Sequence, residues 1–367
     1  MEFLRRNWIV NVGVVAISGL LLASCDFGGS EARQEEEQNC TIDPDQFREA
    51  AERGSFPFIE RPEIVRAGSE RASEIRADER VIALLVEGTA LAIPHSVIDH
   101  FEILNLESSE WQGGDVAITY CPLTGSSLAF SREAVDGVQF EVSGLLLHDN
   151  LVMVDRQAES SLWSQMKGSA VCGAQAKTGL EEIPVLDVRW SYWQNRHPDS
   201  RVVVGVKKAQ TAEQGHPQVL PDRTGLAAPI SRSTDIPRGL VLGIPGAGGS
   251  RGGGGVPKVV GGPGLAFPFQ SLSSEAPVRV VDAGPNLVVF WNDEARGAMA
   301  YRTSASFTVQ NGMIVDDATG SQWALDGRAV SGPRAGEQLP PVASAYVALG
   351  DAWVDFHPET DVWRPSP

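Results

Sequence analysis

The chain has 367 residues, of which 42% are hydrophobic, enough to form the cores of two domains of ordinary size. Its formal net charge of −17 argues against binding to nucleic acid, or to anionic lipid through a basic patch. After the amino-terminal region, no apolar run approaches the ~20 residues that a membrane-spanning helix needs. Composition therefore predicts a water-soluble folded part with an acidic surface.

The first 24 residues have the layout of a secretory signal peptide. Arg5 and Arg6 precede an apolar stretch over residues 9–23, and the segment ends in Leu-Ala-Ser-Cys25, which resembles the lipobox of bacterial lipoproteins. We expect cleavage before Cys25 and lipid on its thiol. This lipid would anchor the protein to the cell membrane on the extracytoplasmic face, the periplasmic side in a Gram-negative cell. The acidic residues that follow predict a disordered tether over 25–57.

The next part of the chain has the pattern of short strands. Val, Ile, Leu and Phe fill brief runs that Gly, Asp or Pro separate. Helix patterns are few: residues 96–105 predict one helix, and 188–196 predict another that Pro198 ends. The whole pattern predicts a β-dominated α+β fold with a few short helices, and it places strands at 81–86, 116–120, 127–130, 138–142 and 151–154.

Four short motifs occur twice in the same order. The clearest is Trp-x-x-x-His-Pro, at 193–198 and again at 353–358. The other pairs begin at Leu91 and Leu265, at Asp115 and Asn286, and at Asp155 and Asp316. We expect two homologous lobes that arose from an internal repeat. The segments are a first lobe at 58–205, a linker at 206–235, and a second, degenerate lobe at 236–367 with a glycine-rich loop at 245–255.

The run TYCPLTGSS at 119–127 carries a resemblance to a known family. Glu-Ile-Leu-Asn precedes it at 102–105, and a long phrase at 143–163 and the motif at 193–198 follow it. Together they resemble family 3179 of the domains of unknown function, found in bacterial secreted proteins and lipoproteins, whose members carry a run close to TYCPLCGTA. The resemblance covers about residues 58–363. Some members of the family are selenoproteins, which implies a redox-active or metal-binding centre in this motif.

The chain departs from that family at the second cysteine of the motif, which is Thr124 here. A two-thiol redox pair within the motif is therefore excluded. Either Cys121 acts alone, or it works with Cys172, or the chemistry has been lost.

Besides Cys25, three cysteines remain, so at most one internal disulfide can form in an oxidising compartment. Cys121 follows a predicted strand and precedes Pro122, a position that can expose a thiol to a cleft. An exposed thiol with a lowered pKa would act as a nucleophile or as a ligand for a soft metal. The alternatives are a buried, inert thiol and a structural disulfide between Cys121 and Cys172.

Several polar side chains are candidates to bind a ligand near Cys121. Those in the motif can instead form an ordinary turn around Gly125. A thiolate, imidazole and thioether set at Cys121, His95 and Met153 would suit a soft transition metal such as copper, although no tight spacing supports it. The binding candidates are Tyr120, Thr124, Gly125, Ser126, His95, His148 and Arg156, of which Arg156 has no counterpart in the second copy.

His197 and His357 recur with their tryptophans in both copies, which favours a structural role at the ends of helices. Three functions are compatible with the sequence. The favoured one is a cell-envelope lipoprotein that binds a small ligand or metal, or uses thiol redox chemistry, around Cys121. The second is a non-catalytic module that binds another envelope protein. The third is an enzyme with Cys121 as nucleophile and His95 or His148 as base.

Overall fold

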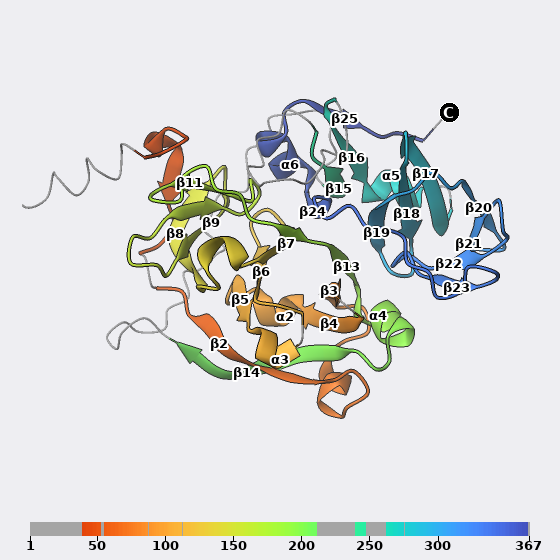
Figure 1. The fold of residues 1–367 in the computed structure, drawn as a ribbon, viewed down its shortest axis with the longest axis horizontal. Coiled ribbons are helices and arrows are strands. Elements are labelled where there is room, and N and C mark those ends of the chain that lie inside the picture. The colour runs from red at the N-terminus through yellow and green to blue at the C-terminus, as the bar shows by residue number, and fades with distance from the viewer. Residues whose placement is uncertain are drawn as a thin grey trace, which may run out of the picture.

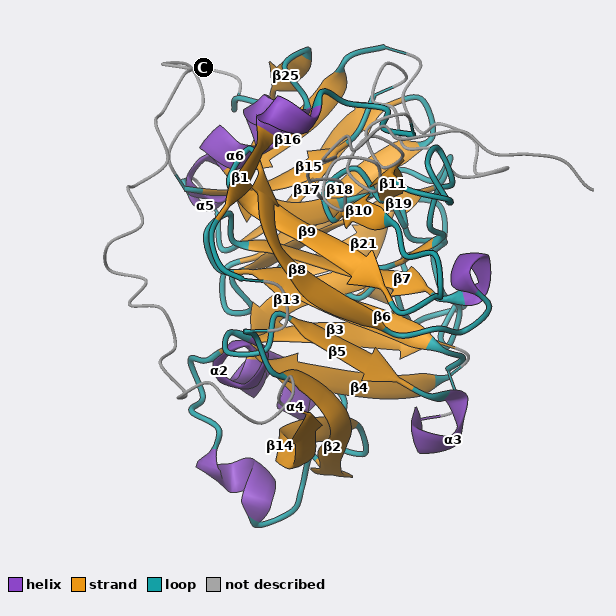
Figure 2. Cartoon of the chain, turned by 90° about the vertical axis from the view of Figure 1, so that its left-hand side faces the viewer, coloured by secondary structure: helices purple, strands orange, loops and turns teal. Residues whose placement is uncertain are grey.

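The computed structural model describes residues 39–365, apart from 53–54, 87, 112, 211–238, 247–261 and 275. Strands dominate these residues, and short helices lie around them (Figure 2). The expected β-dominated α+β fold is therefore confirmed. None of the helices in the described ranges has the length and apolar character of a membrane span. The predicted signal peptide, Cys25, nearly all of the predicted linker and most of the glycine-rich loop lie outside the described residues.

One large sheet passes through both halves of the chain (Figure 1). A contact between Ser127 and Val347 joins the strands of the two halves. A further short strand, β12 (Glu182–Ile183), pairs with β7. The order of the other strands is β13 (Val185–Arg189), β3 (Arg80–Val86), β4 (Thr89–Pro94), β14 (Arg201–Gln210), β2 (Phe58–Arg66), β5 (Ile103–Leu106), β6 (Val116–Cys121), β7 (Ser126–Ser131), β24 (Tyr346–Leu349), β15 (Leu240–Ile244), β16 (Gly264–Pro268) and β25 (Thr360–Val362).

Three smaller sheets complete the β structure. The first contains β1 (Phe47–Glu49), β8 (Phe140–Leu147), β9 (Asn150–Asp155), β10 (Leu162–Ser164) and β11 (Ser169–Cys172). The second contains β17 (Val278–Gly284), β18 (Leu287–Asn292) and β19 (Gly297–Arg302). The third contains β20 (Phe307–Gln310), β21 (Met313–Asp316), β22 (Gln322–Trp323) and β23 (Ala329–Ser331).

The helices are short. They are α2 (His95–Ile98), α3 (Ser108–Trp111), α4 (Trp190–Arg196), α5 (Phe269–Ser273) and α6 (Gly350–Phe356), together with the single turns η1 (Pro44–Gln46), η2 (Arg71–Glu74) and η3 (Glu133–Val135). The helix expected at 188–196 is confirmed as α4, which stops before Pro198 because proline has no N–H to continue the ladder. The five strands expected in the first half are confirmed as β3, β6, β7, β8 and β9.

The helix expected at 96–105 is wrong beyond its first turn. Glu102 adopts a φ of 59°, which ends helical geometry, and the next residues form β5. All four residues of β5 are buried, with β2 on one side and β6 on the other. The sheet therefore overrides the local helical pattern.

The disordered tether expected for 25–57 is wrong over residues 39–52. In this stretch β1 pairs with β8, and Cys40 forms a disulfide with Cys172 across a sequence separation of 132 residues. The covalent link and the strand pairing fix this segment on the first half. Residues 25–38 lie outside the described residues.

The two halves have the same order of strand pairings. β3 pairs antiparallel with β4 and β13, and β15 pairs antiparallel with β16 and β24. β14 runs parallel to β4, and β25 runs parallel to β16. The four strands β8 to β11 correspond in order to β20 to β23. Descent of both halves from one repeated unit stays a prediction, and this shared order supports it.

Helices α4 and α6 each contribute a tryptophan to a core that contains residues of both halves. Trp193 of α4 packs with residues of β18, β19 and β22, among them Phe290 and Trp323. Trp353 of α6 packs with residues of β6, β9 and β10, among them Met153 and Trp163. The halves are therefore interlocked, and their seam is made of buried hydrophobic side chains.

Candidate functional site

Cys121 does not face a cleft. Its side chain belongs to the core that also contains Met153 and Trp353, and only 1% of the residue is exposed. The thiol lies 3.8 Å from the carbonyl oxygen of Asp149, to which it donates. Burial and then the negative charge of Glu102 raise the pKa of Cys121, so the thiol stays protonated at neutral pH.

The disulfide considered between Cys121 and Cys172 is wrong, because Cys172 is bonded to Cys40. Cys121 lies at the end of β6 inside the core, whereas Cys172 ends β11, where the amino-terminal segment reaches it. The pairing of Thr41 with Val171, through a backbone hydrogen bond of 2.7 Å, brings Cys40 to this position. Among the described cysteines, the one without a disulfide is thus the one in the motif.

Other motif residues form a closed polar network inside the protein. Ser126 donates to Gln165 Oε1 at 2.7 Å, and Asn150 Nδ2 donates to Thr124 and Ser126 at 3.0 and 3.1 Å. Gln165 Nε2 in turn donates to Thr119 at 2.9 Å. All five side chains are buried and satisfied by one another, so this network has the character of a structural core element.

Gly125, with a φ of 58°, supplies the turn between β6 and β7. Gly125 also packs against the second half, since a Cβ added to it would lie 3.4 Å from side-chain atoms of Leu240 and Leu349. The carbonyl of the preceding Thr124 accepts the backbone N–H of Leu349 at 2.8 Å. The motif turn is therefore part of the seam between the halves.

Tyr120 points to the opposite face of the sheet from Cys121, since successive side chains of a strand alternate. Its ring lies 4.4 Å from that of His95, centroid to centroid. The expected copper set of Cys121, His95 and Met153 is consequently split between two faces of the sheet. The same separation removes His95 as a base for Cys121. Among the described residues, no group of three or more His, Cys, Asp or Glu side chains could hold a metal ion.

The two remaining candidates for ligand binding, His148 and Arg156, contact residues near them in the fold. His148 packs edge-on against Phe356, with ring centroids 5.4 Å apart. Arg156 pairs with Glu141 at 3.0 Å and lies 5.1 Å from the ring of Phe58. The structure places neither of them beside His95.

His95 is instead part of a buried charge cluster around Asp187. Its Nε2 lies 3.2 Å from Asp187 Oδ2, Arg80 Nη2 lies 2.7 Å from Asp187 Oδ1, and Ser127 donates to Oδ2 at 2.8 Å. Burial alone would raise the pKa of Asp187, but the charges of Arg80 and His95 outweigh it and hold the pKa well below its usual range. Arg80 also donates to the carbonyl of Arg296 in the second half.

The second half has apolar residues at the corresponding positions. Leu240 pairs with the residue before α6 as Arg80 pairs with the residue before α4, and Phe269 begins α5 as His95 begins α2. Val347 takes the place of Asp187, two residues before Leu349. The fold thus accepts apolar side chains at these positions, and the charges are particular to the first half.

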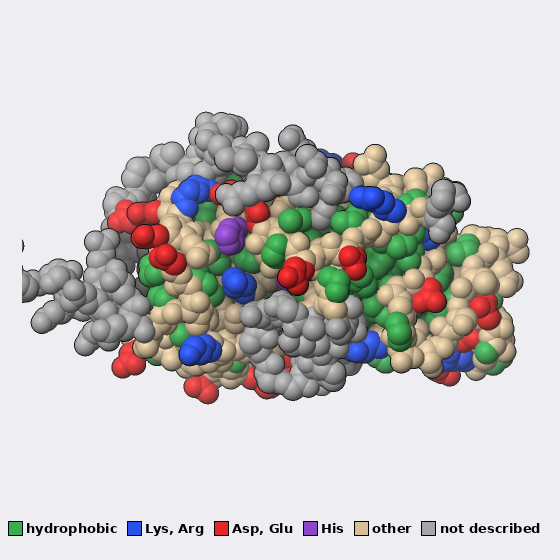
Figure 3. Space-filling view, turned by 90° about the horizontal axis from the view of Figure 1, so that it is seen from above, with side chains coloured by type: hydrophobic (Ala, Val, Ile, Leu, Met, Phe, Trp, Pro, Cys, Tyr) green, Lys and Arg blue, Asp and Glu red, His purple; other side chains and the backbone are tan. Residues whose placement is uncertain are grey.

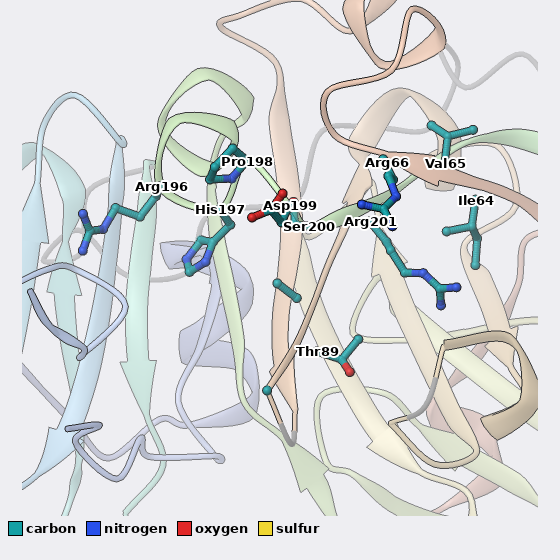
Figure 4. Close-up of a pocket in the computed structure, with 12 residues that line it drawn as sticks. Ile64, Val65, Arg66, Thr89, Arg196, His197, Pro198, Asp199, Ser200 and Arg201 are labelled. Carbon is teal, nitrogen blue, oxygen red and sulfur yellow. The ribbon is translucent and has the colours of Figure 1, made fainter. Parts of the chain in front are cut away.

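A larger hollow than that beside His95 lies elsewhere, at the end of α4. It has a volume of about 710 Å³ and is walled by residues of β2, of the turn between β3 and β4, and of the segment from α4 into β14. Figure 4 shows Arg66 and Arg201 on neighbouring strands among the residues that line this hollow. Asp199 is the carboxylate of its lining, and Arg196 points away toward the second half.

Arg66 and Arg201 are direct cross-strand partners in the antiparallel pair β2 and β14. Like charges at such positions repel each other. Arg201 donates to the carbonyl of Glu110 at 2.7 Å, and the side chain of Arg66 makes no hydrogen bond or ion pair with any described residue. Neither guanidinium is paired with a carboxylate within the described ranges, so the guanidinium of Arg66 and the remaining N–H groups of Arg201 are available to an anion.

His197 forms the inner wall of this hollow. Its ring stacks on Trp193 with centroids 4.2 Å apart, and its Nε2 lies 2.9 Å from Asp326 Oδ2 of the second half. The two atoms are close enough for an ion pair, although their alignment is not that of a hydrogen bond. The structural role expected for His197 stays a prediction. Because His197 also lines the hollow, a ligand there would contact its ring.

The second half has a hollow of about 390 Å³ at the equivalent place, beside His357 and Pro358. Phe356 stands there where the first half has Arg196. Asp361 pairs with Leu265 as Arg201 pairs with Leu91, so an acid replaces the arginine. His357 binds the hydroxyl of Tyr346 at 3.0 Å. Within the described ranges, the cationic lining is therefore found in the first half.

Sequence reasoning did not single out Arg66 or Arg201. They are 135 positions apart by their numbers in the chain, and only the register of β2 with β14 makes them neighbours. The signal that could have found them is the comparison of the two copies, in which arginine at 201 corresponds to aspartate at 361.

Comparison with known proteins supports the resemblance seen in the sequence. Searches among curated proteins and among solved structures found no match. The sequence pattern of one family, described as "Protein of unknown function (DUF3179)", matches residues 53–360, which is most of the chain and includes both halves. The chain belongs to this family.

Proposed function

We propose that the protein is a cell-envelope lipoprotein, anchored by lipid on Cys25, whose folded part binds a small anionic molecule between Arg66 and Arg201. The anchor is supported by the signal-like segment and the lipobox at its end. The binding function keeps the small-ligand role expected from the sequence, but it moves the centre from the buried Cys121 to the hollow beside α4.

The observation that carries this proposal is the facing pair of arginines. Both arginines are exposed, and strand register makes them cross-strand neighbours, so their like charges repel each other and would be neutralised by an anion between them. A carboxylate or phosphate would then accept charge-assisted hydrogen bonds from both. In a chain with a net charge of −17, a cationic hollow of this kind stands out from its surroundings.

The corresponding hollow of the second half supports the same reading. It has the same helix end, the same His-Pro turn and an acid in the same place, Glu359 for Asp199, but Asp361 stands where the first half has Arg201. Among the described residues, the hollow of the second half is therefore formed without arginine, and the arginines of the first half are a separate feature. We expect one anion per chain.

The test is isothermal titration calorimetry with inorganic phosphate and with acetate, on the full chain carrying Cys25→Ser to prevent lipidation. We expect a stoichiometry near one for phosphate. The double variant R66Q/R201Q should weaken binding at least tenfold, because each charge-assisted contact contributes about 1.5–3 kcal/mol. The matched control R48Q/R71Q removes two exposed arginines outside the hollow and should bind as the parent does.

Equal binding by both double variants would overturn the proposal, as would absence of binding by the parent chain. Binding of another envelope protein, the alternative function, stays a prediction. So does a cysteine-dependent reaction, which the burial and raised pKa of Cys121 disfavour.

A further inference from the structure

A second hollow, of about 390 Å³, adjoins the arginine hollow and crosses the seam between the halves. The two hollows share the lining residues Gly88, Ala90 and His197. Their linings differ: the first is dominated by arginine and polar side chains, whereas much of the second is apolar. The apolar part of its lining consists of Ala83, Leu85, Ala90, Pro184, Leu186, Trp193, Met299 and Pro341.

The charges along this path favour a ligand with only one charged end. Arg66 and Arg201 lie at the first hollow, and the buried carboxylate of Asp326, paired with His197, lies at the second. An anionic group that passed His197 would meet this carboxylate and the apolar walls, at a high cost in desolvation. Arg328 also lines the second hollow, but it is exposed to solvent, whereas Asp326 is buried. The Asp326 carboxylate and the apolar walls therefore favour an uncharged, apolar part of the ligand in this hollow.

The apolar walls of the second hollow come from both halves, so neither half forms this hollow alone. Leu85 of β3 and Leu186 of β13 belong to the first half, and Met299 of β19 belongs to the second. Leu85 is 37% exposed, which is unusual among the large hydrophobic residues of this protein. A side chain of this kind at a cavity rim is available to cover an apolar ligand.

We propose that the ligand is an amphipathic monocarboxylate, whose carboxylate lies between Arg66 and Arg201 and whose unbranched apolar chain extends past His197 into the second hollow. This inference rests on the proposed function, because it needs the anion site as its anchor. It adds the chemical class of the ligand and the direction in which the ligand lies.

The experiment is a calorimetric series of acetate, butyrate, hexanoate and octanoate on the full chain with Cys25→Ser. We expect the dissociation constant to fall by about fourfold for each added methylene that enters the second hollow. The increase in affinity should stop once the hollow is filled. The series uses ligands below their micelle-forming concentrations, so that only monomeric carboxylate is present.

Two variants locate the chain of the bound ligand. Leu85→Gln replaces an exposed apolar wall and should weaken octanoate at least threefold while leaving acetate unchanged. Val309→Gln is the matched control, since Val309 is 40% exposed on β20 and does not line the hollow. It should leave the whole series unchanged. R66Q/R201Q should weaken acetate and octanoate by the same factor.

The outcomes separate the two proposals. Acetate and phosphate that bind through the arginines without any gain from chain length overturn the amphipathic ligand and leave the anion site intact. Octanoate that binds equally well to R66Q/R201Q overturns the inference, because its binding is then independent of the anion site, and the phosphate titration alone decides the proposed function. A dicarboxylate that binds more tightly than the monocarboxylate of equal length would place charge near Arg328 at the far end, and would also overturn the inference.

Discussion

Cys121 shows how a residue can stand out in the sequence and be inaccessible in the fold. The thiol follows a tyrosine in β6, and alternation places it on the inner face of the sheet. There it packs beside Met153 and Trp353. A protonated, buried thiol is a poor nucleophile, because the thiolate is the reactive form.

We predict that Cys121 is not alkylated in the native protein and becomes labelled only on unfolding. The measurement is the mass of the protein after iodoacetamide treatment, with and without denaturant and without reductant. Cys40 and Cys172 are the internal control, since their disulfide should resist labelling until it is reduced. Rapid native labelling of Cys121 would show that the core around it opens.

The cluster of Arg80, His95 and Asp187 gives a second prediction for single residues. Arg80→Leu alone should lower the free energy of unfolding by about 3 kcal/mol, because it leaves a buried carboxylate short of a partner. The triple variant R80L/H95F/D187V carries the residue types of the second half. It should be as stable as the parent or more stable by about 1–4 kcal/mol, since apolar replacement of buried ion pairs is often neutral or favourable.

Urea unfolding followed by tryptophan fluorescence measures both variants. A triple variant less stable than Arg80→Leu would show that the charges themselves hold the seam together. A neutral triple variant would show instead that the charges are not needed for stability.

At the scale of elements, the sequence predicted strands better than it predicted helices. The strands at 116–120 and 127–130 have β-branched and apolar residues on both faces, which suits a sheet covered on both sides. The stretch 96–105 has a helical pattern as well, but the need for a buried strand between β2 and β6 overrides it. Local pattern contains no information on such long-range pairing.

The amino-terminal strand β1 depends on the disulfide for its place. In the folded chain, Cys40 and Cys172 close a loop long enough that cross-linking should remove about 4–5 kcal/mol of unfolded-state entropy. We predict that the double variant C40S/C172S loses about this much unfolding free energy in urea. Arg48→Gln, which removes only the exposed ion pair of β1, should change stability by less than about 1 kcal/mol. Similar losses in the two variants would assign the contribution to the strand and not to the disulfide.

At the scale of the whole molecule, the halves share hydrophobic cores. Figure 1 shows the two halves side by side, and the cores around Trp193 and Trp353 both cross their seam. On the face seen in Figure 3, hydrophobic side chains gather toward the end that carries the second half. The order of motifs in the sequence suggested two lobes, but the cores that they share could be seen only in the structure.

We predict one cooperative unfolding transition for both halves. Trp193→Ala and Trp353→Ala should each lower the free energy of unfolding by about 3–5 kcal/mol, because each leaves a cavity in a core shared by both halves. The midpoint temperature of unfolding should fall accordingly. Differential scanning calorimetry should show a single peak for the parent and for both variants. Two separate peaks in either variant would mean that the halves fold independently.

The site was less predictable than the fold. The motif residues Tyr120, Thr124 and Ser126 have partners within the protein, and their contacts stabilise the sheet and its seam. The arginines that face each other come from strands at opposite ends of the first half. Their pairing depends on register between distant segments, which periodicity in a single sequence does not contain.

The most direct test of the account is the effect of phosphate on the stability of Arg66→Gln. Without an anion, the free energy of unfolding of the variant should exceed that of the parent by a few tenths of a kcal/mol, because repulsion from Arg201 is gone. The variant should therefore unfold at a slightly higher urea concentration. With phosphate at about 100 times its dissociation constant, the parent should gain about 2.7 kcal/mol and become the more stable protein. An order of stability that is the same with and without phosphate would contradict an anion site between Arg66 and Arg201.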